Sequence, residues 1–437
     1  MMIKALIKMI NFHPQHLELQ QEIHARPHPI IKSPCVVSHI AFFHSNKDVS
    51  LEYDALNTLA RTFQVNGVTP TSNSYFQDFG PFELRWENHR EFSTITVIRS
   101  ANKTGNSNGF ALDVFPKDWL SQFPGEAISA CHVSIGQFED ITTIEQVLGA
   151  SAKIACNVMQ SQMQNPASIW SSLQTDKEGF TQFVINTESN AESNADTQTG
   201  RLLLMILEIE TYRQMSLLAL PVAKNIAPKA TQLGQECAAI LANIAKIDTS
   251  ADESKLLQKL TNVAAEVERL RASSSFRFSA TRAYSELVNS RLDELGQQPI
   301  EGKDMLGEFL QRRFMPAIRT CASVSLQLES LSKRLTRASD LLRTRVDQTI
   351  AEQNQKLLES MNHRSHMQLR LQQTVEGLSV AAISYYLISL LKIVLHGFSE
   401  EFFHVNENLV LVIISPIVLL TIFIIVRNMK KHYVDDA

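Results

Sequence analysis

Two long apolar stretches near the C-terminus constrain this chain more than any other feature. The first runs from Leu378 to about His396 with one charge, Lys392, and the second runs from Leu409 to Val426 with none. At 1.5 Å per residue, each is about long enough to cross the roughly 30 Å hydrocarbon core of a bilayer. A buried helical hairpin of a soluble domain is the alternative. We expect a transmembrane hairpin over residues 377–431, with spans at about 378–396 and 409–426 and a basic tail.

The charges that flank the two stretches predict their orientation. Arg364 and Arg370 precede the first stretch, whereas Arg427, Lys430 and Lys431 follow the second. The connecting residues 397–408 contain no Lys or Arg. Because positive charge is retained on the cytoplasmic side, both chain ends and residues 1–376 are expected in the cytoplasm. The sequence therefore predicts a membrane protein with two spans and both chain ends on the cytoplasmic side.

Residues 1–186 have the mixed pattern of an α+β domain. Apolar residues at helical spacing predict a helix over 51–65. Alternating or β-branched segments predict strands at 36–44, 82–88, 92–99, 110–115 and 130–138. In the second of these, Leu84 and Trp86 are expected to face a core, while Arg85 and Glu87 face outward.

The rest of the soluble part reads as helical. Residues 187–200 have no large apolar side chain, which predicts a polar, disordered linker. A mainly helical domain is expected over 201–303 and one long stalk helix over 304–376, interrupted only at Pro316. The stalk has a heptad-like seam of apolar residues: Val324, Leu328, Leu331, Leu335, Ala338 and Leu342. This seam needs partners, which are the preceding helices, the same helix of other subunits, or both.

Several runs of residues resemble a known bacterial family. They are 22–27 (EIHARP), 84–92 (LRWENHREF), 208–213 (EIETYR), 342–347 (LRTRVD), 352–354 (EQN) and 369–380 (LRLQQTVEGLSV). The family is a domain of unknown function described as a predicted membrane-anchored protein. The resemblance spans most of the chain and implies a membrane anchor in the inner membrane of a bacterium, but it implies no particular activity.

The order of the predicted parts is also similar to that of the CorA-type magnesium channels. Those proteins have a cytoplasmic α/β domain, a long stalk helix, two C-terminal spans and a basic tail, and five subunits line the pore with the first span. Their Gly-Met-Asn motif is absent at the end of the first stretch, where residues 392–399 read KIVLHGFS. The likeness is one of topology alone.

The first apolar stretch has a polar face that the second lacks. Helical spacing places five residues on that face: Gln372, Glu376, Ser379, Tyr386 and Ser389. In an oligomer, this stripe could line a conduit for cations, with Glu376 forming an acidic ring at its cytoplasmic mouth. Alternatively, small and hydroxylated residues let the two spans pack closely.

Two clusters in the N-terminal part are candidate binding sites. Glu87, His89 and Glu91 alternate along a predicted strand, and two carboxylates with an imidazole can bind a divalent cation. The alternative is a solvated strand face with cross-strand ion pairs. The second cluster lies near Pro27 and Pro29, where it could bind a phosphate or dock against the domain. Its members are Glu22, His24, Arg26 and His28.

Several function classes find no support in the sequence. A glycine-rich phosphate loop, a Gly-x-Ser-x-Gly elbow and an HExxH motif are all absent. The net charge of −4 gives no electrostatic case for nucleic-acid binding. The five scattered cysteines are typical of reduced cytosolic thiols.

We therefore expect a cytoplasm-facing homo-oligomeric scaffold or interaction module in the lipid bilayer, rather than an enzyme. A CorA-like cation channel is the alternative, and a metal-dependent enzyme that uses Glu87, His89 and Glu91 is a third hypothesis.

Overall fold

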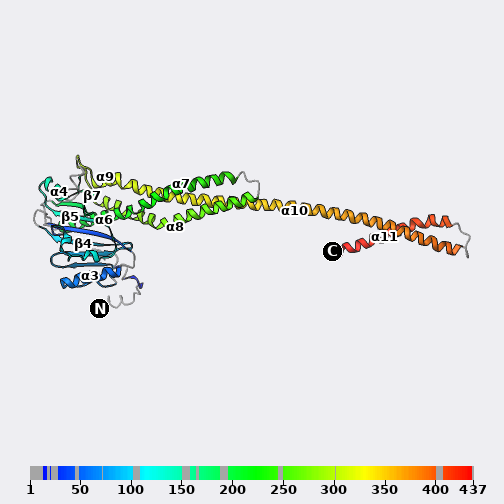
Figure 1. Cartoon of the computed structure of the whole chain (residues 1–437), viewed down its shortest axis with the longest axis horizontal. Coiled ribbons are helices and arrows are strands. Elements are labelled where there is room, and N and C mark those ends of the chain that lie inside the picture. The colour runs from blue at the N-terminus through cyan, green and yellow to red at the C-terminus, as the bar shows by residue number, and fades with distance from the viewer. Residues whose placement is uncertain are drawn as a thin grey trace, which may run out of the picture. The chain divides into compact units, whose positions relative to one another are not determined.

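The alternating segments of the N-terminal half form a β-sheet (Figure 1). The sheet has eight strands in the order β2-β3-β4-β1-β5-β8-β7-β6. The strands are β1 Cys35–Phe43, β2 Ser74–Asp78, β3 Glu83–Asn88, β4 Phe92–Ser100, β5 Glu126–Gly136, β6 Met159–Gln162, β7 Ala167–Thr175 and β8 Thr181–Thr187. The β5–β8 pair is parallel, and the other neighbouring pairs are antiparallel. The sheet is therefore mixed.

This computed structural model describes residues 13–16, 20, 28–44, 49–70, 72–101, 109–149, 158–163, 167–187, 195–244, 250–300, 302–399 and 407–435. Its helices are α3 Val49–Phe63, η1 Ala111–Val114, η2 Leu120–Gln122, α4 Ile141–Val147, α6 Ala195–Leu217, α7 Ala219–Ile244, α8 Ser250–Glu294, α9 Leu306–Arg313, α10 Met315–Ser399 and α11 Glu407–Asp435. The chain divides into a first unit (residues 1–246 and 255–338) and a second unit (247–254 and 339–437).

Both faces of the sheet are buried, because neighbouring residues of a strand point to opposite sides. On one face, Leu84 and Trp86 pack with Leu56 and Leu59 of α3. On the other face, residues such as Val37 pack against α6. The predicted strands at 36–44, 82–88, 92–99 and 130–138 are confirmed within a residue or two at β1, β3 and β4, whereas β5 starts earlier and ends at Gly136.

The buried carboxylate of Glu52 links α3 to the sheet through hydrogen bonds. It accepts hydrogen bonds from Trp86 Nε1 at 2.6 Å and Ser93 Oγ at 2.8 Å. Since a buried charge is tolerated only with such partners, these bonds fix the position of the first turn of α3.

The strand predicted at 110–115 is wrong, because this segment contains the 3₁₀ helix η1. Asp113 accepts a hydrogen bond from the Phe110 backbone N–H at 2.7 Å. Asp side chains compete in this way for backbone donors and favour turns over strands.

The first unit also contains a helical bundle of α7, α8 and the first part of α10. Gln327 of α10 donates to Thr231 of α7 at 3.4 Å, and Arg271 of α8 donates to Ser332 of α10 at 3.1 Å. The seam residues from 324 to 338 are at most 4% exposed. Preceding helices of the same chain therefore cover this part of the predicted stalk.

The predicted linker and stalk have different limits in the structure. Residues 188–194 lie outside the described residues, and α6 already begins at Ala195. The predicted interruption at Pro316 separates α9 from α10, and Pro316 lies in the first turn of α10, where its missing N–H breaks no helical bond. An N-terminal mixed sheet followed by a mainly helical part with one long helix is thus confirmed.

In the second unit, α10 continues to Ser399 and α11 follows. Among the described residues, the helical stretch Leu306–Val394 is long and apolar enough to cross a membrane, by length and composition. Val412–Val426 is a shorter apolar helix.

Candidate functional site

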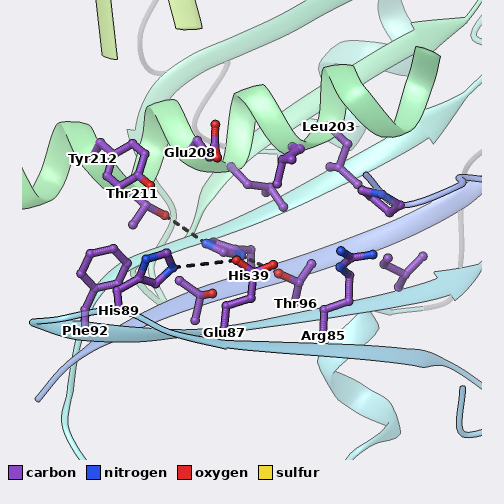
Figure 2. Close-up of a pocket in the computed structure, with 15 residues that line it drawn as sticks. His39, Arg85, Glu87, His89, Phe92, Thr96, Leu203, Glu208, Thr211 and Tyr212 are labelled. Carbon is purple, nitrogen blue, oxygen red and sulfur yellow. Dashed lines mark hydrogen bonds and ion pairs between the residues drawn. The ribbon is translucent and has the colours of Figure 1, made fainter. Parts of the chain in front are cut away.

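A cavity of about 40 Å³ lies in the first unit, between α6 and the face of β1, β3 and β4 (Figure 2). Strand alternation and register bring its polar groups together. Arg85 pairs with Thr96, and Thr96 pairs with His39, so the three lie in one row across neighbouring strands. Glu87 pairs with Thr94 in the next row. Helix α6 supplies Thr211 from the other side.

His39 joins the sheet to α6 at this cavity. Its Nδ1 lies 2.8 Å from Thr96 Oγ1, and its Nε2 lies 3.0 Å from Thr211 Oγ1. Burial lowers the pKa of His39 to about 4, because the charged imidazolium is disfavoured away from water. The imidazole is therefore neutral at pH 7, and it donates to one threonine while it accepts from the other.

Arg85 and Glu87 place opposite charges at the cavity. The Arg85 guanidinium carbon lies 4.1 Å from the centre of the Phe76 ring. Burial lowers the pKa of Arg85, whereas the Glu87 and Glu83 carboxylates act in the opposite direction. Figure 2 shows both side chains reaching from β3 toward α6. The site thus combines a desolvated cation with a nearby carboxylate.

The predicted cation ligands Glu87, His89 and Glu91 do not converge on one point. His89 Nε2 lies 3.9 Å from Glu87 Oε2, and both residues line the cavity. Strand β3 ends at Asn88, so the alternation that would align Glu91 with them stops before the turn into β4. Among the described residues, no group of three His, Cys, Asp or Glu side chains could hold a metal ion.

Glu91 instead forms hydrogen bonds that link the β3–β4 turn to α8. Its carboxylate accepts hydrogen bonds from Arg277 Nη2 at 2.7 Å and from the Tyr284 hydroxyl at 2.9 Å. Burial raises the pKa of Tyr284, and the hydrogen bond to Glu91 raises it further. Glu91 thus has a structural partner 186 residues away.

Of the second predicted cluster, Glu22, His24 and Arg26 lie outside the described residues. His28 is exposed and lines a separate cavity of about 280 Å³ together with Glu208 and Arg291. Because most of this cluster lies outside the described residues, its phosphate-binding role stays a prediction.

The residues of the predicted polar stripe lie on one continuous helix. Its residues Gln372, Glu376, Ser379, Tyr386 and Ser389 all belong to α10 and are exposed or half-buried. Large apolar side chains surround the stripe, including Leu378 at 76% exposure and Ile393 at 69%. Whether the stripe lines a conduit or packs against another span stays a prediction.

Sequence reasoning missed His39, Thr96 and Thr211. His39 lies within a β-branched strand, where it has the pattern of a core residue. Its partner Thr211 is 172 residues away. The run 208–213, which resembled the family, was the one sequence signal that marked this part of α6.

Comparison with known families gives one match. The family described as "Protein of unknown function (DUF3422)" matches residues 11–433, nearly the whole chain. A search of curated proteins found no match.

Proposed function

We propose that this chain, which belongs to the DUF3422 family of proteins of unknown function, is a membrane-anchored scaffold or interaction module. In this proposal, the apolar parts of α10 and α11 lie in lipid. The first unit lies in the cytoplasm, where it carries out the scaffold or interaction role. The family membership gives no function, so the membrane anchor, its orientation and the scaffold role are what we propose.

One observation carries the proposal: the apolar parts of α10 and α11 are exposed. Large apolar side chains such as Leu390 at 59% exposure, Val412 at 71% and Leu420 at 62% have little cover within the chain. Apolar helical surface of this extent needs a nonpolar environment, because monomeric soluble proteins rarely expose continuous apolar surface on this scale. A bilayer supplies that environment.

Two spans with both ends in the cytoplasm fit the distribution of charge. Arg427, Lys430 and Lys431 follow the second apolar segment, and arginines precede the first. Retention of these cations on the cytoplasmic side gives the proposed orientation.

Membrane sedimentation tests the anchor. The full-length protein, expressed in bacterial cells, should remain in the membrane pellet after an alkaline carbonate wash and dissolve only with detergent. The double substitution Leu390→Lys and Leu420→Lys should move much of it to the supernatant, because each buried lysine costs about 2.5–3.5 kcal/mol of insertion free energy.

Leu358→Lys is the matched control, because Leu358 is equally exposed on α10 at 64% but precedes the apolar stretch. This variant should sediment like the parent protein. A parent protein that stays in the supernatant without detergent would overturn the anchor, and with it the proposed orientation.

We propose that the homo-oligomer forms through a different part of α10. The seam in the first unit is covered by the same chain, so it no longer calls for other subunits. Beyond it, Ile350, Leu357 and Leu371 are 50%, 62% and 67% exposed. These residues differ by multiples of seven, the spacing of a coiled-coil position, which fits packing against the same helix of a second copy.

Light scattering of the detergent-solubilised protein should give a mass of at least two copies after subtraction of the detergent. The substitutions Leu357→Lys and Leu371→Lys should shift the protein toward the monomer, because like charges then meet at the interface. Lys substitution at the exposed Arg343 is the control. A strictly monomeric parent protein would contradict the oligomer but leave the anchor intact.

A further inference from the structure

We propose that His363 and His366 form a binding site for a late first-row divalent cation such as Zn²⁺ or Cu²⁺. Both residues lie on α10 in the second unit, one helical turn apart. This inference goes beyond the membrane-anchored role and does not depend on it. It rests on the spacing of two imidazoles along a continuous helix, on their exposure, and on their having no other contact partner in the part of the chain that the structure describes.

The spacing of the two histidines suits a chelate. Residues three apart on an α-helix lie on the same side, with their Cβ atoms about 5–6 Å apart. An ion that binds nitrogen at about 2.0–2.1 Å in tetrahedral geometry holds two nitrogens roughly 3.4 Å apart, which rotation of the two side chains can reach. Metal ligands at this spacing on one helix occur in the Glu-x-x-His motif of di-iron four-helix bundles.

The helix around the pair is regular and solvated. Residues 351–370 are helical throughout, and all of them are exposed. Neither histidine makes a hydrogen bond, an ion pair or a ring contact with the described residues, so a bound cation displaces no contact of the protein. Because the helix fixes both Cα atoms before the ion arrives, binding has to order only the side-chain torsions, which lowers its entropic cost.

The neighbouring charges oppose each other. Glu359 lies one turn before His363, and Arg370 lies one turn after His366, on the same side of the helix. The carboxylate attracts a cation at the pair, whereas the guanidinium repels it. Both side chains are exposed, where water and salt screen their effects. The affinity therefore comes from the imidazole nitrogens rather than from the surrounding charge.

The two histidines supply only part of a coordination shell. Among the described residues, no group of three His, Cys, Asp or Glu side chains could hold a metal ion, so Glu359 is not assigned as a third ligand. Water fills the remaining positions, as it fills the open position of catalytic zinc sites. Imidazole suits Zn²⁺, Ni²⁺ and Cu²⁺, whereas Mg²⁺ prefers oxygen ligands. The site should therefore bind Zn²⁺ and Cu²⁺ and discriminate against Mg²⁺.

Equilibrium dialysis against Zn²⁺ tests the site in the full-length, detergent-solubilised protein, purified without a polyhistidine tag. The parent protein should bind Zn²⁺ saturably, and Mg²⁺ should not displace it. His363→Gln and His366→Gln should each weaken this binding about tenfold or more. Loss of an outer-shell partner of a metal ligand typically costs about 10–100-fold in affinity, and loss of the ligand itself should cost at least as much.

Ser365→Gln is the matched control. Ser365 is exposed on the same turn as the two histidines but lies on another side of the helix, so this variant should bind Zn²⁺ like the parent protein. Glutamine is a good helix former, and unchanged circular dichroism in the far ultraviolet should show that all three variants keep their helices.

Absence of saturable Zn²⁺ binding to the parent protein would overturn the proposal. Binding as tight in His363→Gln or His366→Gln as in the parent protein would also overturn it, because the ion would then lie elsewhere. Displacement by an equal concentration of Mg²⁺ would indicate oxygen ligands, with the same consequence. Sedimentation with membranes involves neither histidine, so this inference and the anchor fail independently.

Discussion

Replacing Glu91 with alanine should lower the free energy of unfolding of the first unit by about 3–5 kcal/mol, the usual cost of removing one partner from a buried ion pair. Glu91 is 7% exposed and accepts hydrogen bonds from both Arg277 and Tyr284. Without this carboxylate, the half-buried guanidinium of Arg277, which lies near the rings of Phe43 and Phe276, loses its ion-pair partner. The β3–β4 turn also loses its attachment to α8.

Urea unfolding followed by tryptophan fluorescence measures this effect in the full-length protein in detergent. All three tryptophans lie in the first unit and are at most 3% exposed, so their emission reports its unfolding. The double variant Glu91→Met with Arg277→Met should recover much of the loss, because buried pairs replaced by apolar groups are often tolerated.

The control is Glu266→Ala, which removes an exposed ion pair with Arg269 on the same helix and should leave the urea midpoint unchanged. A loss of less than about 1 kcal/mol in Glu91→Ala, the usual value for a surface pair, would contradict a buried role for Glu91.

Local periodicity predicted much of the sheet because its residues alternate between two buried faces. Leu84 and Trp86 are fully buried, as the alternation of 82–88 required. The same alternation predicts that the opposite side of the strand is exposed. In the structure α6 packs over this side, and Arg85 and Glu87 are half-buried. Periodicity shows that two sets of residues differ in their environment. It does not show that a distant helix packs over the more polar set.

The candidate site depends on contacts between distant parts of the chain. His39 is held by Thr96 and Thr211, which are 57 and 172 residues away. Alternation predicts that Glu91 joins Glu87 and His89, but β3 ends at Asn88 and the chain then turns. The Glu91 carboxylate therefore accepts a hydrogen bond from Arg277 instead. Spacing rules hold within an element, so they fail for a residue just beyond its end.

The heptad-like seam shows a similar limit. The spacing predicts a packed apolar face from Val324 to Ala338, and the seam residues in this range are buried. The same spacing is satisfied equally well by helices of one chain or by another subunit. The identity of the partner comes from tertiary structure, here from α7 and α8.

Acid should destabilise the first unit through two buried histidines. Burial lowers the pKa of His39 to about 4 and also lowers that of His132 to about 4, although Asp176 acts to raise the latter. The ordinary pKa of histidine is 6.5. Between pH 6.5 and 4 the unfolded chain therefore binds more protons than the folded one, so stability falls as the pH falls through this window.

His39→Gln isolates one of these contributions. A glutamine amide can still donate to one threonine and accept from the other, but it does not titrate. If His39 remains neutral to about pH 4, the parent protein should lose up to about 3 kcal/mol between pH 7 and pH 4 through this residue alone. The variant should lack that part of the loss, as measured by urea unfolding at each pH.

An identical pH dependence in His39→Gln and the parent protein would mean that His39 takes up its proton in the folded state as readily as in the unfolded chain. That result would contradict a neutral imidazole shared between Thr96 and Thr211.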